Sequence, residues 1–200
     1  MRVFSYKLVR DFGFAPNPFD GLCTLANCKP QVRSAAKLGD IVIGCGSPAL
    51  NLPEKVIFAM RVDEKLTFDE YWRDPRFSGR KPRFNGSRRH CYGDNIYHRE
   101  DGQWVQEDSH HSYDGGAVNY ENLSRDTNSE AVLLGRDFVY WGGAAIPIPN
   151  ELANGVFGDN LYPTNRSHRS IFPAQFVAEV ERWFKSLSTR GVLGMPASWK

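Results

Sequence analysis

The chain of 200 residues has no long apolar run, no apolar block at its start and no closely spaced pair of cysteines. A membrane-spanning helix needs roughly 20 consecutive apolar residues, and no stretch approaches that length. The first residues alternate in polarity and soon reach Lys7 and Arg10, which is typical of a strand and not of a secretory leader. We therefore expect a cytoplasmic protein without membrane contact.

Metal and cofactor signatures are missing as well. Cys23, Cys28, Cys45 and Cys91 show no C-x-x-C spacing, so free and mostly buried thiols are expected and no metal ligand set is predicted. The chain also lacks the H-E-x-x-H, zinc-deaminase, G-x-G-x-x-G and Walker patterns. The sequence therefore names no cofactor and excludes the enzyme classes that depend on these motifs.

Apolar periodicity predicts a single α+β domain over residues 1–200. A helix is expected over 29–38, and the pair Thr67 and Glu70 predicts a capping box for a short helix. Helical spacing is clearest over 172–187, which predicts a C-terminal amphipathic helix. The main strands are expected at residues 2–9, 41–43, 55–62, 132–134 and 138–141.

The stretch from about residue 74 to residue 128 is dominated by glycine, asparagine and charge. A structureless loop of that length is uncommon in a compact domain, so we expect a polar insertion that contains short strands at 95–98 and 104–106. The insertion carries no acid between Arg76 and Arg89, although the net charge of the chain is only +2. Aromatic residues interleave with its cations, which suits phosphate neutralisation combined with base stacking. The candidate nucleic-acid contacts are Arg80, Lys81, Arg83, Arg88 and Arg89; the alternative is a solvated loop.

Two further segments are candidates for binding a substrate. Lys29 and Arg33 lie four apart at the expected start of a helix, where a phosphate would be favoured, although an ordinary solvated cationic face has the same pattern. The strand that begins at Ile41 runs into Gly44-Cys45-Gly46-Ser47, where small residues allow close approach of a ligand or simply form a bulge or tight turn. Trp141, next to Gly142, is a candidate wall for the same pocket.

The densest group of titratable residues lies inside the insertion. Three of the five histidines fall between Asp94 and Ser112. Such residues serve as general acids or bases, or as metal ligands, and they also cap turns. The candidate catalytic residues are His98, Glu107, Asp108, His110 and His111, and the candidate substrate contacts here are Asp94 and Asn95.

Several segments together resemble the nucleotide modification associated domain 2 family. They are residues 11–19, 25–33, 39–44, 71–77, 93–98, 106–112 and 137–143. The resemblance spans nearly the whole chain. It implies a role in systems that modify DNA bases in phages and bacteria, with nucleotides, DNA and other base-modification proteins as partners.

A weaker similarity concerns the fold. A helix that leads into Gly39-Asp40, an apolar strand and a turn with Ser47 is similar to the start of EVE and ASCH domains. That similarity implies a PUA-like bent β-barrel with flanking helices, in which the turn and Trp141 line a base pocket under the insertion.

Three functions remain open from the sequence. The first is recognition of a modified base or nucleotide in a pocket. The second is an enzyme that makes or removes a base modification with the cluster between Asp94 and His111. The third is an adaptor subunit of a modification complex.

Overall fold

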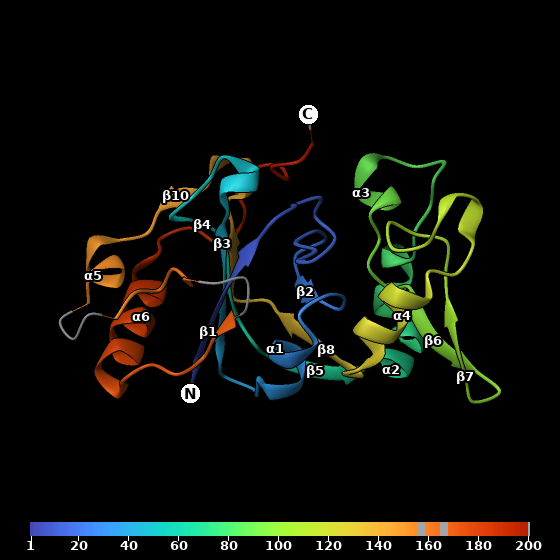
Figure 1. Ribbon diagram of the computed structural model, residues 1–200, viewed down its shortest axis with the longest axis horizontal. Coiled ribbons are helices and arrows are strands. Elements are labelled where there is room, and N and C mark those ends of the chain that lie inside the picture. The colour runs from blue at the N-terminus through green and yellow to red at the C-terminus, as the bar shows by residue number, and fades with distance from the viewer. Residues whose placement is uncertain (156–158, 165–167, 200) are drawn as a thin grey trace.

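The computed structural model describes residues 1–155, 159–164 and 168–199. These residues form a seven-stranded main sheet, a three-stranded second sheet and a two-stranded hairpin (Figure 1). The strands are β1 (Val3–Leu8), β2 (Cys23–Leu25), β3 (Ile41–Gly46), β4 (Lys55–Arg61), β5 (Glu64–Thr67), β6 (Tyr97–Glu100), β7 (Gln103–Gln106), β8 (Ala131–Gly135), β9 (Phe138–Tyr140), β10 (Ile146–Pro147), β11 (His168–Arg169) and β12 (Gly191–Val192). The helices are α1 (Pro30–Ala35), α2 (Phe68–Arg73), α3 (Arg88–Cys91), α4 (Tyr120–Thr127), α5 (Asn150–Ala153) and α6 (Ala174–Ser186).

The main sheet is mixed and open. Its order is β11-β1-β3-β4-β9-β12, and β10 also pairs with β4. β1 runs parallel to β3 and β9 runs parallel to β12, whereas the other neighbours are antiparallel. No sheet among the described residues closes into a barrel, so the expected PUA-like barrel is not confirmed. The chain has a mixed architecture of sheets and helices.

Alternation along the strands separates two apolar layers. On β1, Val3 faces one layer, while Phe4 and Tyr6 face the other. The first layer is covered by α6, whose apolar stripe includes Phe176 and Val180. The second layer lies between the main sheet and three other elements, which are β2, β8 and α1. Both faces of the main sheet are therefore buried, which explains its nearly continuous apolar strands.

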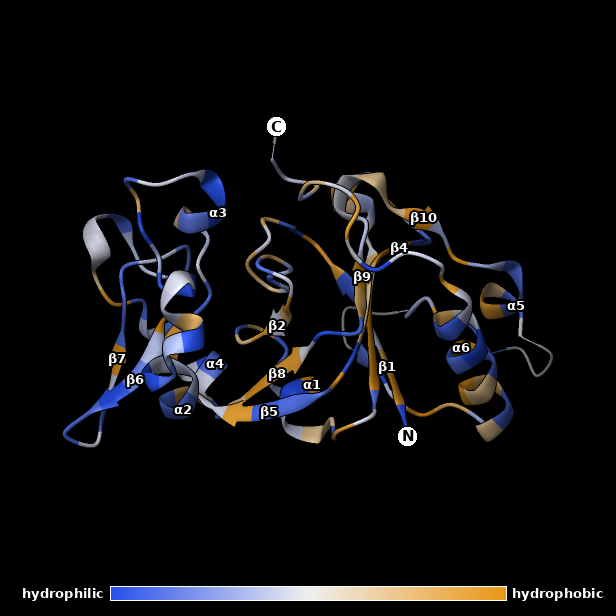
Figure 2. Ribbon diagram, turned by 180° about the vertical axis from the view of Figure 1, so that it is seen from behind, coloured by the Kyte–Doolittle hydropathy of each residue, from blue (hydrophilic) through white to orange (hydrophobic). Residues whose placement is uncertain are grey.

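The insertion and α6 lie at opposite ends of the molecule (Figure 1). The insertion contains α3, the β6–β7 hairpin and α4, and its ribbon is mostly hydrophilic (Figure 2). A third apolar cluster joins it to the second sheet through residues such as Phe77 and Ile96, which meet Val132 and Leu134 of β8. The division into one domain with an insertion stays a prediction.

Most expected elements are present with shifted ends. The capping box of Thr67 and Glu70 is confirmed at the start of α2. The helix expected over 29–38 ends earlier, at Ala35, because Ala36 is extended. The glycine turn expected after Ile43 is not formed, since β3 continues to Gly46. The alternative of a bulge is confirmed, because the register of β3 on β4 shifts between Gly44 and Cys45.

Gly44→Ala tests the close packing around this glycine. A Cβ at Gly44 would lie 2.2 Å from Phe58 Cε1 and 2.5 Å from Leu8 Cδ1, so both side chains would have to shift. We expect the free energy of unfolding in urea to fall by about 1–3 kcal/mol. Gly79→Ala is the matched control, because nothing lies within 4 Å of its added Cβ. Equal stability of the two variants would contradict the packing role of Gly44.

Candidate functional site

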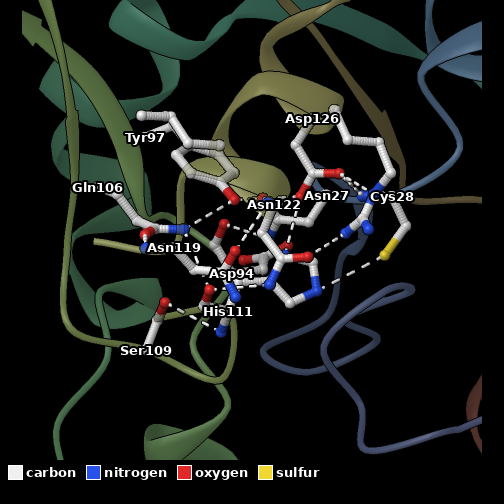
Figure 3. A network of polar contacts seen from close by, with 12 residues as sticks. Asn27, Cys28, Asp94, Tyr97, Gln106, Ser109, His111, Asn119, Asn122 and Asp126 are labelled. Atoms are coloured by element: carbon white, nitrogen blue, oxygen red, sulfur yellow. Dashed lines mark hydrogen bonds and ion pairs between the residues drawn. The ribbon is translucent and has the colours of Figure 1, made fainter. Parts of the chain in front are cut away.

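A cysteine, a histidine and an aspartate from three separate segments meet in one network of polar contacts (Figure 3). Nδ1 of His111 lies 2.8 Å from Oδ2 of Asp126, and Nε2 of the same ring lies 3.8 Å from Sγ of Cys28. Asp126 is fully buried, His111 is nearly so and Cys28 is half-buried. A thiol, an imidazole and a carboxylate in this order form the relay that orients and activates a nucleophile.

The backbone at the cysteine is unusual. Cys28 has φ 59° and the next residue, Lys29, has φ 43°, although neither is glycine. Left-handed backbone costs an ordinary residue about 1–2 kcal/mol and persists where the surroundings impose it. Here the N–H of Cys28 donates to Oδ1 of Asp126 at 3.1 Å, and its carbonyl accepts from Nε of Arg33 at 2.8 Å. Hydrogen bonds to both the N–H and the carbonyl of Cys28 therefore fix the backbone that carries the sulfur.

Arg33 supplies most of that restraint. Its guanidinium is buried and donates to the carbonyls of Cys28, Asp126, Ser129 and Ala131. These contacts join the loop before α1 to the end of α4 and the start of β8. The sequence proposed Arg33 as a phosphate contact, but its donors are occupied by the protein's own backbone, so we assign it a positioning role.

Asp126 is the centre of the polar network. One oxygen accepts from the Cys28 backbone and the other contacts His111 and the Tyr97 hydroxyl, the latter at 3.2 Å. Gln106 donates to the Tyr97 hydroxyl and to the His111 carbonyl, each at 3.2 Å. The sequence interpretation missed Asp126. The pattern that could have indicated Asp126 is its position three residues after Leu123, which places its side chain on the buried face of α4.

The electrostatics separate the two adjacent histidines. Burial opposes the charged form of His111, but its hydrogen bonds to Asp126 and Cys28 outweigh burial and raise its pKa to about 9. Burial also opposes ionisation of Asp126, and the contact with His111 nevertheless lowers the pKa of that carboxyl. His110, by contrast, has its pKa lowered to about 4 by burial, His111 and Arg10. At neutral pH His111 is an imidazolium and His110 is neutral.

The same three groups could hold a metal ion. The ligand atoms of Cys28, His111 and Asp126 lie within 4.8 Å of one another. Thiolate, imidazole and carboxylate are a donor set that suits Zn²⁺. In the present arrangement, however, Nδ1 of His111 faces Asp126 and not an open position. Each ring nitrogen of His111 therefore faces one of the other two groups.

The candidate catalytic residues divide into separate groups. His98 is stacked on Trp72, with ring centroids 3.9 Å apart, and its nitrogens lie 3.2 Å from Glu100 and 3.8 Å from Glu107. No hydrogen bond, ion pair or ring contact in the described part of the chain links His98 to His110 or His111. His111 therefore belongs to the relay, and His98 with Glu107 does not.

His110 and Asp108 face cavities in the insertion. A cavity of 470 Å³ is lined by His110 and by residues of α3 and the C-terminal segment. A second cavity, of 370 Å³, is lined by His110, Asp108 and neighbouring residues. The rings of His110 and His111 are 5.9 Å apart, so these cavities lie beside the relay.

Several predicted substrate contacts are buried. Asp94 accepts hydrogen bonds from Thr24 and from Tyr71, and it lies 3.9 Å from Arg80. Its neighbour Asn95 donates to the carbonyls of Tyr71 and Phe77. These side chains brace the insertion against the second sheet.

Two other predicted contacts lie on the main sheet. Trp141 packs beside Trp183 of α6, with ring centroids 6.4 Å apart. Ser47 is buried with no hydrogen-bond partner for its hydroxyl among the described residues. Within the described parts of the chain, no hydrogen bond, ion pair or ring contact joins either residue to Cys28, His111 or Asp126.

The predicted nucleic-acid contacts differ in exposure. Arg80 is buried and donates to the Phe19 and Leu22 carbonyls, and Lys81 lies over the Trp72 ring at 3.3 Å. The exposed cations of the set are Arg83, Arg88 and Arg89, of which Arg89 pairs with Asp20 at 3.2 Å. Within the predicted set, these three side chains are the ones at the surface of the insertion.

Lys29 and Tyr6 lie beside the cysteine. Lys29 Nζ is 4.8 Å from the centre of the Tyr6 ring, and burial lowers the pKa of this lysine. The Tyr6 hydroxyl is buried and has no hydrogen-bond partner among the described residues. Burial raises the pKa of Tyr6, and Cys28 adds to that shift.

The fold and site define the chain as an α/β protein with a buried Cys–His–Asp relay. The sequence model described as nucleotide modification associated domain 2 matches residues 1–200, and the chain belongs to this family. No curated protein and no solved structure gives a significant match. In the described residues no helix combines the length and apolar character needed to cross a membrane.

His111→Gln tests the electrostatics of the relay. Because folding raises the pKa of His111 from 6.5 to about 9, its contribution to stability is complete below pH 6.5 and is lost as the pH rises through 9. Wild type should lose on the order of 3 kcal/mol of unfolding free energy across this window, and the variant should not. The measurement is urea unfolding at a series of pH values.

His110→Gln is the matched control for that experiment. With a pKa of about 4, His110 stays neutral throughout the window, so its replacement should leave the pH slope unchanged. A slope that survives His111→Gln would show that another group carries it.

Proposed function

We propose that this protein is a thiol-dependent enzyme of a nucleotide-modification system, with Cys28 as nucleophile, His111 as proton carrier and Asp126 as the residue that orients His111. The observation that carries this proposal is the 3.8 Å approach of Cys28 Sγ to the imidazole that Asp126 holds at 2.8 Å. Membership of the nucleotide modification associated domain 2 family supports the substrate class.

The proposed step is attack of the sulfur on an electrophilic carbon of the nucleotide. A cysteine reacts as its thiolate, and thiolates are stabilised beside a protonated histidine. In the proposed step the thiolate form of the sulfur bonds to the carbon, and Nε2 of the His111 imidazolium donates its proton to the atom that receives the displaced electron pair. Asp126 accepts from Nδ1 and so keeps Nε2 directed at the sulfur.

Lys29 and Tyr6 are proposed to bind the substrate near the thiol. A half-buried ammonium with no carboxylate partner among the described residues favours a phosphate or another anion. The unpartnered hydroxyl of Tyr6 would donate to an oxygen of the same ligand. Lys29 thus keeps the substrate-binding role that the sequence suggested for the start of α1. Tyr6, from β1, takes the place of Arg33 as the second contact.

A nucleotide-binding module without chemistry is the second candidate. The observation that favours it is the pair of cavities that share His110. In this case the polar network around Asp126 would only brace the cavity wall. The two candidates differ in what they require of Cys28, because a binding module needs no reactive thiol.

Alkylation by iodoacetamide at pH 7 separates these candidates. We expect Cys28 to react at least about tenfold faster than Cys91, because Cys28 faces an imidazolium. Asp126→Asn should slow Cys28 toward the rate of Cys91 by removing the negative charge that helps keep His111 protonated. Rates are read by peptide mass spectrometry of the folded protein.

The chain supplies its own controls for this measurement. Cys91 is half-buried like Cys28, but its thiol donates to the backbone carbonyls of Arg83 and Phe84 and has no imidazole partner among the described residues. Cys23 and Cys45 are buried, and burial raises the pKa of Cys45 to about 12 and that of Cys23 further, so both should stay unreactive. Equal rates for Cys28 and Cys91, or a rate of Cys28 that Asp126→Asn leaves unchanged, would remove the basis for the enzyme proposal.

A further inference from the structure

The larger cavity lies between the insertion and the C-terminal segment. It has a volume of 470 Å³, within the range of small-molecule sites. It is lined by Phe84, Arg88, Cys91, Tyr92, Ser109, His110, Ser198 and Trp199. None of these residues belongs to the Cys28–His111–Asp126 relay.

The aromatic wall of this cavity is held in place. Tyr92 stacks on Phe12 with ring centroids 4.9 Å apart and an interplanar angle of 9°. The Trp199 indole donates to the Phe12 carbonyl at 2.9 Å, which fixes its orientation near Tyr92. His110 meets Phe12 edge-on at 4.7 Å. A planar ligand would find rings already arranged for stacking.

Phe84 provides a second aromatic surface. It lines both cavities and is 56% exposed, although it is large and apolar. The segment around it carries the exposed cations Arg83 and Arg88 and no acid. An aromatic ring among cations is the combination that binds bases and phosphates of single-stranded nucleic acid.

The two cavities have opposite electrostatic character. Arg88 lines the larger one, which has no acidic residue in its wall. Asp108 and Asp114 line the smaller one, and both cavities share Phe84, Ser109 and His110. A phosphate is therefore favoured at the Arg88 end, and a hydrogen-bond donor is favoured at the Asp108 end.

We propose that the adjoining cavities bind a nucleotide whose base stacks between Phe84 and the Tyr92–Trp199 wall, with its phosphate toward Arg88. A hydroxyl or amino substituent of the base points toward Asp108 and Asp114. The site selects bases that carry such a donor over unsubstituted ones. Lys29, Tyr6 and Cys28 line neither cavity, so this is a second nucleotide site and the inference goes beyond the proposed function.

The test is equilibrium binding followed by protein fluorescence. The probes are dTMP, 5-hydroxymethyl-dUMP, and single-stranded eight-nucleotide DNA containing one of these bases at its centre. Wild type is expected to bind the hydroxymethyl form more tightly than the thymine form. Phe84→Ala and Arg88→Ala are each expected to weaken binding about tenfold, as stacking and phosphate contacts do elsewhere. Asp108→Ala is expected to abolish the preference for the hydroxymethyl base.

Tyr120→Ala is the matched control, because Tyr120 is 74% exposed on the same insertion and lines neither cavity. Binding that is unchanged in both Phe84→Ala and Arg88→Ala, or no binding of any probe by wild type, would overturn the proposal. Tighter binding of DNA than of the mononucleotide identifies a base within a strand as the ligand, and equal binding identifies a free nucleotide.

Cys28→Ala keeps this test separate from the test of the enzyme. The variant should bind the probes like wild type, because Cys28 lines neither cavity. If Cys28 proves unreactive while Phe84→Ala still weakens binding, the cavity stands and the thiol chemistry fails. If Cys28 is reactive and Phe84→Ala has no effect on binding, the thiol chemistry stands and the cavity proposal fails.

Discussion

The buried guanidinium of Arg33 connects segments that the chain keeps far apart. It donates to the carbonyls of Cys28, Asp126, Ser129 and Ala131, which belong to the loop before α1, the end of α4 and the start of β8. Buried carbonyls need partners, and a planar cation with several donors satisfies four of them at one point. The relay depends on this junction because the thiol and the carboxylate approach each other only when these segments meet. The insertion is thereby tied to the sheet that carries the cysteine.

A second constraint lies in the two charges beside that junction. Burial alone would leave both His111 and Asp126 uncharged, but their mutual contact moves the pKa values of the pair apart and keeps both ionised at neutral pH. Desolvation opposes this buried ion pair, but the hydrogen bonds of His111 outweigh it, because the pKa of His111 is raised to about 9 despite burial. This ion pair lies beside the half-buried thiol of Cys28, and that position distinguishes the network from ordinary core packing. The neutral His110, one position earlier, shows that the effect is specific to the partner and not to the segment.

Local patterns predicted the framework better than the site. The spacing of β1, β4, β9 and α6 follows from alternation and helical periodicity, which are encoded within each segment. His111 was predicted from its neighbours, but Cys28 is 83 residues away and carries no motif, so only the fold reveals their contact. Arg33 and Asp94 were predicted to bind ligand because charge in a sequence does not indicate burial. Their partners are backbone carbonyls and internal hydroxyls that no spacing rule describes.

The separation of the apolar clusters has a consequence for evolution. The layers on the two faces of the main sheet are made largely of residues from β1, β3, β4, β9 and α6, whereas the cluster beneath the insertion is distinct. Changes to the cavity walls therefore leave the main sheet intact, and a lineage can acquire a new ligand preference without first acquiring surplus stability. Substitutions in the insertion can accumulate, while selection removes substitutions around Arg33. Divergence among relatives should accordingly be greatest around Phe84 and least in the strands.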